Sequence, residues 1–142
     1  MGAGDSGVGR AGLVRSYPAV RQSVAAIRAD LARFASEWGA PSRIAEAAAL
    51  AASEAATNVV MHAYRDSADP GQMEVTGALE TDEMVITVRD AGTGLRPRID
   101  SPGLGLGLAI IAKIVDRLDL RESPGGGVEV RMYFALSRHP ST

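Results

Sequence analysis

Residues 73–90 read MEVTGALETDEMVITVRD, and this stretch predicts the centre of the fold. Apolar and polar side chains alternate along two runs, Met73 to Leu79 and Met84 to Asp90, which the polar residues Glu80 to Glu83 separate. Because successive side chains of a strand point to opposite faces, this period of two predicts an antiparallel hairpin. The apolar residues of the second run share their parity with Asp90, so the pattern turns its carboxylate toward the core.

Two helices are predicted before the hairpin. The first follows Pro18 with apolar residues at helical spacing, and Gly39-Ala40-Pro41 supplies its stop signal. Ser42 is expected to cap the second, an Ala-rich run from Ile44 to about His62 with high helix propensity. Its small side chains predict close packing against another element.

The segments after the hairpin complete the predicted fold. Residues 91–107 are rich in glycine and proline and are expected to form a loop that feeds a third helix near Leu108. A last strand pair is expected at 118–122 and 128–136, and residues 13–17 can add an edge strand. This order predicts an α+β fold of two layers, with helices packed on one face of a mixed, mainly antiparallel sheet.

Length and composition exclude several classes of protein. The 142 residues predict one domain at 13–138, with a flexible arm at 1–12 and a tail at 139–142. The absence of cysteine excludes disulfide scaffolds, thiolate zinc sites and iron–sulfur clusters. A net charge of -2 without a basic stripe argues against direct nucleic-acid binding. No apolar run approaches the roughly 20 residues of a membrane span, so we expect a cytoplasmic protein without membrane contact.

Three clusters of residues are candidates for chemistry, and the first lies on the second helix. Glu54, Asn58 and His62 follow one another at intervals of four, so they project from roughly one helix face. A solvated polar stripe is one explanation, but the apolar neighbours predict a covered helix, in which an unpaired carboxylate is costly. Glu54 could then be a general base and Asn58 a magnesium ligand. His62 either contacts the site or packs at the helix end.

The second cluster is Asp90-Ala91-Gly92-Thr93-Gly94, which ends the second strand of the hairpin. A buried carboxylate must accept hydrogen bonds, and the exocyclic amine of a purine is one suitable donor. Gly92 and Gly94 would let a ligand approach the backbone. The alternative is an Asp-Gly turn that binds nothing.

The third cluster is Gly103-Leu104-Gly105-Leu106-Gly107-Leu108, which leads into the third helix. Exposed backbone N–H groups and the positive end of the helix dipole suit a polyphosphate, although a flexible hinge is the alternative. The one lysine, Lys113, does not follow the glycine-rich turn, so this is not a Walker loop. It is not a dinucleotide fingerprint either, because no βαβ unit surrounds it.

In this order and spacing, the three clusters resemble the ATP-binding motifs of the GHKL superfamily, which includes gyrase, histidine kinases and mismatch-repair ATPases. Within it, the string SEAATNVVMHAY at residues 53–64 is similar to the small bacterial anti-sigma factors that are also serine protein kinases. The resemblance covers residues 17–136. It implies a Bergerat-type sandwich that uses ATP and magnesium (Mg2+). It also implies a homodimer that sequesters a sigma factor and phosphorylates a serine of an anti-sigma factor antagonist protein.

The resemblance also implies a role for each matching residue. Glu54 would be the general base, Asn58 the magnesium ligand, and Asp90 the acceptor for the adenine amino group. The remaining residues would shape the base pocket or cover the phosphates: Gly92 and Gly94, then Gly103, Leu104, Gly105, Leu106, Gly107 and Leu108.

The sequence departs from this family pattern in two places. Residues 95–102 are short for an ATP lid, and Gly127-Val128 stands where such proteins carry Gly-Thr near the adenine. Valine cannot donate the hydrogen bond that threonine can. These departures leave open a non-catalytic module that binds a sigma factor or another regulator with weak or lost use of nucleotide. A detached histidine-kinase catalytic domain is the third alternative, but no helix with a phosphoacceptor histidine precedes the domain.

Overall fold

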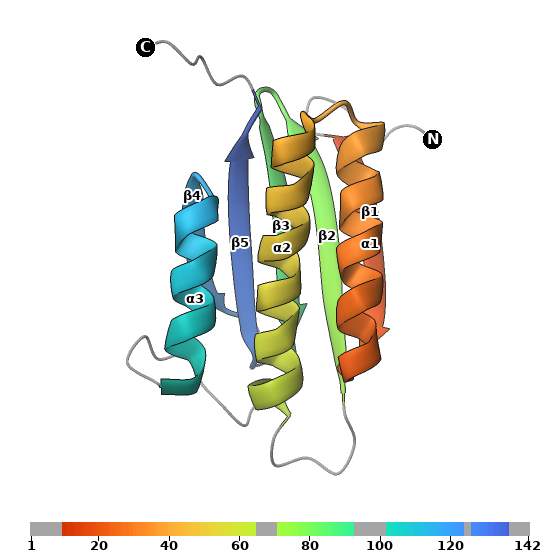
Figure 1. The fold of residues 1–142 in the computed structure, drawn as a ribbon. Coiled ribbons are helices and arrows are strands. Elements are labelled where there is room, and N and C mark those ends of the chain that lie inside the picture. Colours follow the sequence, from red (N-terminus) through yellow and green to blue (C-terminus); the bar gives the residue numbers. More distant parts are fainter. Residues whose placement is uncertain (1–9, 65–70, 93–101, 124–125, 137–142) are drawn as a thin grey trace.

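The computed structural model describes residues 10–64, 71–92, 102–123 and 126–136, which form two layers (Figure 1). Five strands make one sheet, and three α-helices cover one of its faces. This confirms the α+β class and the helical layer on one face of the sheet. In chain order the elements are β1 (Arg10–Pro18), α1 (Arg21–Glu37), α2 (Ser42–Asn58), the π-helical turn η2 (Val59–Ala63), β2 (Gln72–Glu80), β3 (Glu83–Asp90), α3 (Pro102–Ile114), β4 (Arg117–Glu122) and β5 (Val128–Ala135).

The predicted hairpin forms the middle of the sheet, whose strand order is β1-β2-β3-β5-β4. Pairing of β2 with β3 runs from Met73 and Asp90 to Glu80 and Glu83, so the connection is Thr81-Asp82 rather than the four residues expected. All four pairings among the described strands are antiparallel, which corrects the expected mixed sheet. The physical reason is that β5 lies between β3 and β4, so these two strands, which run in the same direction, do not pair with each other.

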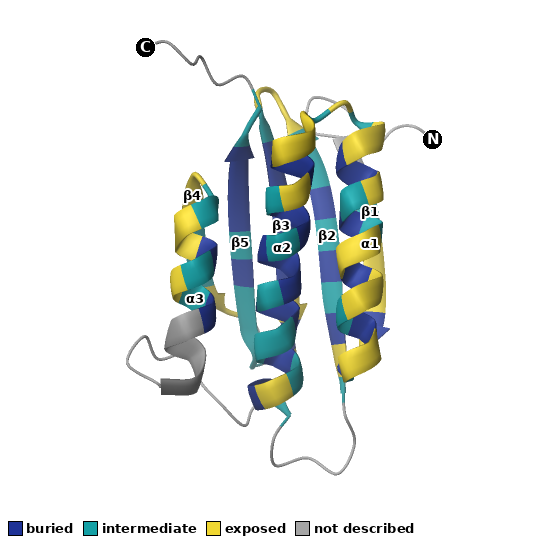
Figure 2. Ribbon diagram, viewed as in Figure 1, coloured by how far each residue is buried: buried dark blue, intermediate teal, exposed yellow. Residues whose placement is uncertain are grey.

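The core lies between the sheet and the helices, as the alternation of the hairpin predicts. Figure 2 shows buried residues along the inner sides of α1 and α2 and along β2, β3 and β5. Met84, Ile86 and Val88 are fully buried, and Asp90, which shares their parity, is 6% exposed. Five alanines of α2 have no exposed surface, so this helix packs closely on the sheet: Ala48, Ala51, Ala52, Ala55 and Ala56.

The second helix differs from the prediction at both ends. Pro41 occupies the N-cap position and Ser42 is already helical, without a capping hydrogen bond from a side chain. At the other end the α-helix stops at Asn58, and residues 59–63 form the π-helical turn η2. Such turns are rare and are frequently found at functional sites.

Two other elements begin earlier in the chain than expected. Strand β1 starts at Arg10, so residues 10–12 extend the edge strand rather than the flexible arm. Helix α3 starts at Pro102, so residues 102–107, the last part of the stretch expected as a loop, lie in the first turns of a helix. Proline is favoured at the first position of a helix, which accounts for a start at this residue.

A hydrogen bond joins the edge strand to the first helix. The hydroxyl of Tyr17 on β1 donates to Asp30 Oδ2 on α1 at 2.7 Å. Burial, with this hydrogen bond as the next cause, raises the pKa of Tyr17 to about 12. In the part of the chain that the structure describes, no helix is both long enough and apolar enough to cross a bilayer.

Candidate functional site

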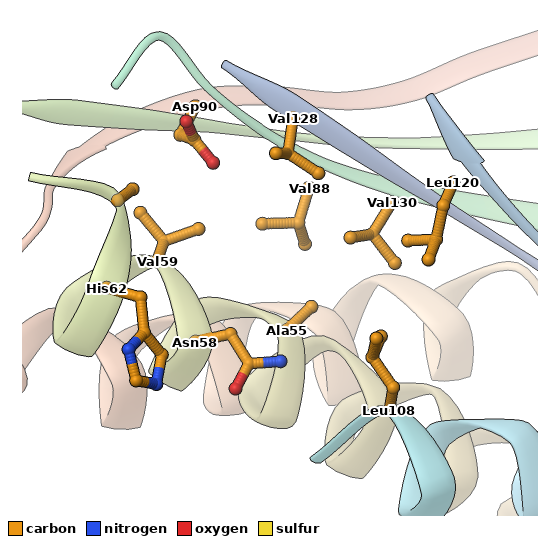
Figure 3. A pocket seen from close by; sticks show the side chains of 11 residues that line it. Ala55, Asn58, Val59, His62, Val88, Asp90, Leu108, Leu120, Val128 and Val130 are labelled. Atoms are coloured by element: carbon orange, nitrogen blue, oxygen red, sulfur yellow. The ribbon is translucent and has the colours of Figure 1, made fainter. Parts of the chain in front are cut away.

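A cavity lies between the end of α2 and the strands β3, β4 and β5 (Figure 3). Its volume is about 40 Å³, and its walls are mostly apolar. A largely apolar cavity with a few convergent polar groups is the usual form of a small-molecule site. The lining residues come from the helical layer and from the sheet: Ala55, Asn58, Val59, His62, Ala63 and Leu108 on one side, and Val88, Asp90, Leu120, Val128 and Val130 on the other.

Asp90 extends from the end of β3 into this cavity (Figure 3). Its Oδ1 accepts a hydrogen bond from the Gly92 N–H at 2.9 Å, and the Val128 N–H also donates to the carboxylate. Burial raises the pKa of Asp90 above its ordinary 3.8, and these two N–H groups oppose the rise. A carboxylate held in this way keeps acceptor capacity for a donor on a ligand.

Two glycines allow the backbone to close around Asp90. A Cβ at Gly92 would overlap the carbonyl oxygen of Ala63 at the end of η2. A Cβ at Gly127, whose φ is +90°, would overlap the carbonyl oxygen of Asp90. In the structure the group that approaches Gly92 closely is therefore the protein's own backbone. Gly94, the other predicted pocket glycine, lies outside the described residues.

Replacing Gly92 by alanine is expected to lower the free energy of unfolding by about 2–3 kcal/mol, the upper range for overpacking, because the obstacle is backbone. Urea unfolding monitored by circular dichroism measures the change. Gly39→Ala is the control, because Gly39 has a φ of +84° but nothing within 4 Å of an added Cβ. It should lose about 1 kcal/mol, the usual cost of the left-handed backbone. Equal losses in both variants would contradict steric conflict at Gly92.

Gly107 of the glycine-rich stretch, in the second turn of α3, lies against Asn58. A Cβ at Gly107 would lie 3.0 Å from Asn58 Oδ1, so glycine at this position leaves space beside the amide. Leu108 lines the cavity next to it. The other predicted residues of this stretch lie in the first turns of α3, where the structure describes the backbone alone: Gly103, Leu104, Gly105 and Leu106.

Glu54 and His62 take different positions relative to the cavity. Glu54 is half-buried on α2, one turn before Asn58, and does not line the cavity. His62 is 7% exposed and lines it, within the π-helical turn. Sequence reasoning left both a site role and a packing role open for His62, and its buried place in the cavity wall is compatible with either role.

Sequence reasoning missed the apolar wall formed by β4 and β5. Leu120 and Val130 are paired across these strands, and both line the cavity. Alternation within each strand could have placed them on the inner face. It could not have shown that this part of the inner face is the part next to Asp90, because that depends on β5 pairing with β3.

Among the described residues, no group of three or more His, Asp or Glu side chains could hold a metal ion. Asn58 lines the cavity with a side-chain amide, whose oxygen is of the ligand type that magnesium accepts.

Similar proteins are known over most of this chain. Residues 17–134 match the model of the histidine kinase-like ATPase domain. The anti-sigma F factor of Pasteuria penetrans is 31% identical, over 56% of this chain and 61% of that protein. The serine-protein kinase RsbW of Bacillus mycoides is 30% identical, over 82% of this chain and 81% of the relative.

A solved structure has the same fold. The RsbU and RsbW domains of a Mycobacterium tuberculosis protein match with a TM-score of 0.67 and 23% sequence identity. The match covers 89% of this chain and 33% of the solved chain, so it concerns a part of that larger protein. At this identity the likeness establishes the fold alone.

Proposed function

This chain belongs to the family of histidine kinase-like ATPase domains, and on that premise we propose that it is an anti-sigma factor and ATP-dependent serine protein kinase. The observation that carries the proposal is the buried Asp90 carboxylate, held by two backbone N–H groups in an apolar cavity opposite Asn58. Two relatives bear the names anti-sigma F factor and serine-protein kinase RsbW, which supports the same role here.

The base of ATP would occupy the cavity beside Asp90. The adenine amine would donate to this carboxylate, and the flat ring would lie between Val59 of η2 and Val88 of β3. A cavity of about 40 Å³ must widen to admit the ring. Leu108, in the middle of α3, is the part of the wall that we expect to move outward.

Asn58 is the residue that would hold magnesium, through its amide oxygen. The space beside Oδ1 that Gly107 leaves open fits this role, because a methyl group there would crowd the amide. When bound, magnesium neutralises charge on the phosphate oxygens. The backbone N–H groups at the start of α3 would face the phosphates and stabilise their negative charge.

Glu54 would act as the general base for phosphoryl transfer. The Oγ of a serine on the antagonist protein forms a bond to the γ-phosphorus, and the bond from this phosphorus to the β–γ bridging oxygen breaks. ADP leaves, and the serine proton passes to the Glu54 carboxylate. Glu54 lies one helical turn from Asn58 and is half-buried, so it would be close to the phosphates and still accessible to a protein substrate.

The partners follow from this role and remain predictions. They are a sigma factor, which the protein would sequester, and an antagonist protein, whose phosphorylation would control release of the sigma factor. We also predict a homodimer that binds neither nucleic acid nor a membrane.

Calorimetric titration with ATP, with and without magnesium, tests the proposal. Wild type is expected to bind ATP with micromolar or lower Kd, and Asn58→Ala is expected to lose the magnesium-dependent part of the affinity, about tenfold for one charge-assisted contact. Gln22→Ala is the control, because Gln22 is an exposed amide on α1. Absence of ATP binding by wild type would contradict the proposal.

That result would favour a non-catalytic module that sequesters a regulator. Val128 favours this second candidate, because a hydrocarbon side chain lines the cavity where the family pattern has threonine. Two measurements together distinguish the candidates. One is binding of a sigma factor in the absence of nucleotide, and the other is transfer of phosphate to an antagonist protein. Full binding without any transfer would identify the module.

A further inference from the structure

Tyr64 connects three segments behind the Asp90 cavity. Its hydroxyl donates to the carbonyl oxygen of Gln72, at the start of β2, at 2.6 Å. The same hydroxyl accepts from the N–H of Ala91, just after β3, at 2.9 Å. Its ring packs against Gly71, where an added Cβ would overlap it. One side chain therefore joins the end of η2 to the beginning of β2 and the end of β3.

We propose that Tyr64 is a positioning residue that fixes the backbone after Asp90 and thereby sets the preference of the cavity for a 6-aminopurine. The inference rests on the proposed function, because it assigns a role in base selection to a residue outside the cavity wall. Tyr64 does not line the cavity, so it acts through the strand end and not by touching the base.

The geometry of two successive N–H groups supports this role. The Ala91 N–H is held by Tyr64, and the next one, of Gly92, is held by Asp90 Oδ1 at 2.9 Å. The first bond fixes the peptide that follows Asp90, and the second fixes the carboxylate itself. A shift of Ala91 would move both the backbone of Asp90 and the donor that orients its side chain.

The chemistry of the phenol explains why tyrosine fits this position. A hydroxyl can donate to a carbonyl oxygen and accept from an N–H at the same time, whereas phenylalanine can do neither. The π-helical turn η2 ends at Ala63, directly before Tyr64, and Gly92 packs on the carbonyl oxygen of Ala63. The end of the helix and the end of β3 are therefore joined at two adjacent residues.

The variant Tyr64→Phe removes the hydroxyl and keeps the ring, and its affinities for ATP and for inosine triphosphate test the selectivity. Inosine carries a carbonyl in place of the adenine amine. We expect Kd for ATP to rise about fivefold, the effect of about one hydrogen bond, with a much smaller change for inosine triphosphate. Tyr17→Phe is the matched control, because it also removes a hydroxyl with a 2.7 Å hydrogen bond, but the partner of that hydroxyl is the Asp30 side chain on α1 and not the backbone next to Asp90.

If Tyr64→Phe only destabilised the fold, it would weaken the binding of both nucleotides equally. An unchanged ratio of the two Kd values would therefore overturn the inference. The second measurement is amide hydrogen exchange of Gly92, which needs no nucleotide. In Tyr64→Phe this exchange is expected to rise at least about threefold, because its bond to Asp90 loosens. In Tyr17→Phe it should stay unchanged.

Unchanged exchange of Gly92 in Tyr64→Phe would overturn the inference whether or not ATP binds. If wild type fails to bind ATP, the proposed function and the selectivity are both wrong. Faster Gly92 exchange in the variant would then still support the effect of Tyr64 on the backbone. The two failures are therefore distinguishable.

Discussion

Replacing Glu54 by glutamine is expected to slow phosphoryl transfer to an antagonist protein by about 10²–10⁴-fold, the usual contribution of a general base. Glutamine has nearly the same shape but cannot take the proton of the serine hydroxyl. Kd for ATP should stay within about twofold of wild type, because Glu54 does not line the cavity that we assign to the base. Single-turnover transfer of labelled phosphate measures the rate, and calorimetry measures Kd. Glu54→Ala should show the same separation of rate from binding.

Glu46→Gln is the matched control for this prediction. Glu46 is an exposed carboxylate two turns earlier on α2, so its replacement removes a charge from the same helix without touching the site. Transfer by this variant should equal that of wild type. A parallel loss of ATP binding and transfer in Glu54→Gln would indicate that Glu54 holds the nucleotide and is not the base.

Asp90→Asn is expected to raise Kd for ATP by about 10–100-fold, because a hydrogen bond to a charged acceptor is typically worth more than one to a neutral acceptor. The new amide also presents N–H donors where the adenine amine must donate. Asp119→Asn serves as the control, since Asp119 lies on β4 outside the cavity and contacts Tyr133 and Arg121. Equal affinity of wild type and Asp90→Asn would show that the carboxylate does not recognise the base.

The pH dependence of stability gives a second readout for Asp90. Burial raises its pKa above 3.8 in the folded protein, so the folded state binds this proton more tightly than the unfolded chain. Its contribution to stability is complete below pH 3.8 and is lost as the pH rises through the raised pKa. Asparagine does not titrate, so the unfolding free energy of wild type minus that of Asp90→Asn should fall over this window. Urea unfolding of both proteins from about pH 3.5 upward measures this difference in unfolding free energy. A difference that rises with pH would contradict the assignment.

Local patterns in the sequence were sufficient to predict most of the helices and strands and which of their faces are buried. The period of two in residues 73–90 predicted the central hairpin and the inward direction of Asp90, both of which are confirmed. Helical spacing predicted α1 and α2 within a few residues. These predictions hold because the alternation of side chains along a strand or helix depends only on the backbone near each residue.

Boundaries and neighbours were predicted less well, because contacts distant in sequence decide them. The last part of the stretch expected as a loop, residues 102–107, lies in α3, where Gly107 packs beside Asn58. The regular helix predicted to His62 ends in a π-helical turn, which brings Ala63 against Gly92. Local propensity cannot predict the contact of Gly107 with Asn58 or that of Ala63 with Gly92, because each joins residues that are distant in the sequence.

The sequence by itself determined the chemistry available to this protein, and the tertiary structure decided how that chemistry is arranged. Glu54, Asn58 and Asp90 could be identified from residue type and spacing, and their roles still await the experiments above. That Asp90 meets the wall formed by Leu120 and Val130, or that the Tyr64 hydroxyl holds Ala91, could not be inferred from spacing. These contacts depend on β5 pairing with β3 and on the end of η2 packing on the end of β3, and such pairings arise only when the whole sheet is assembled.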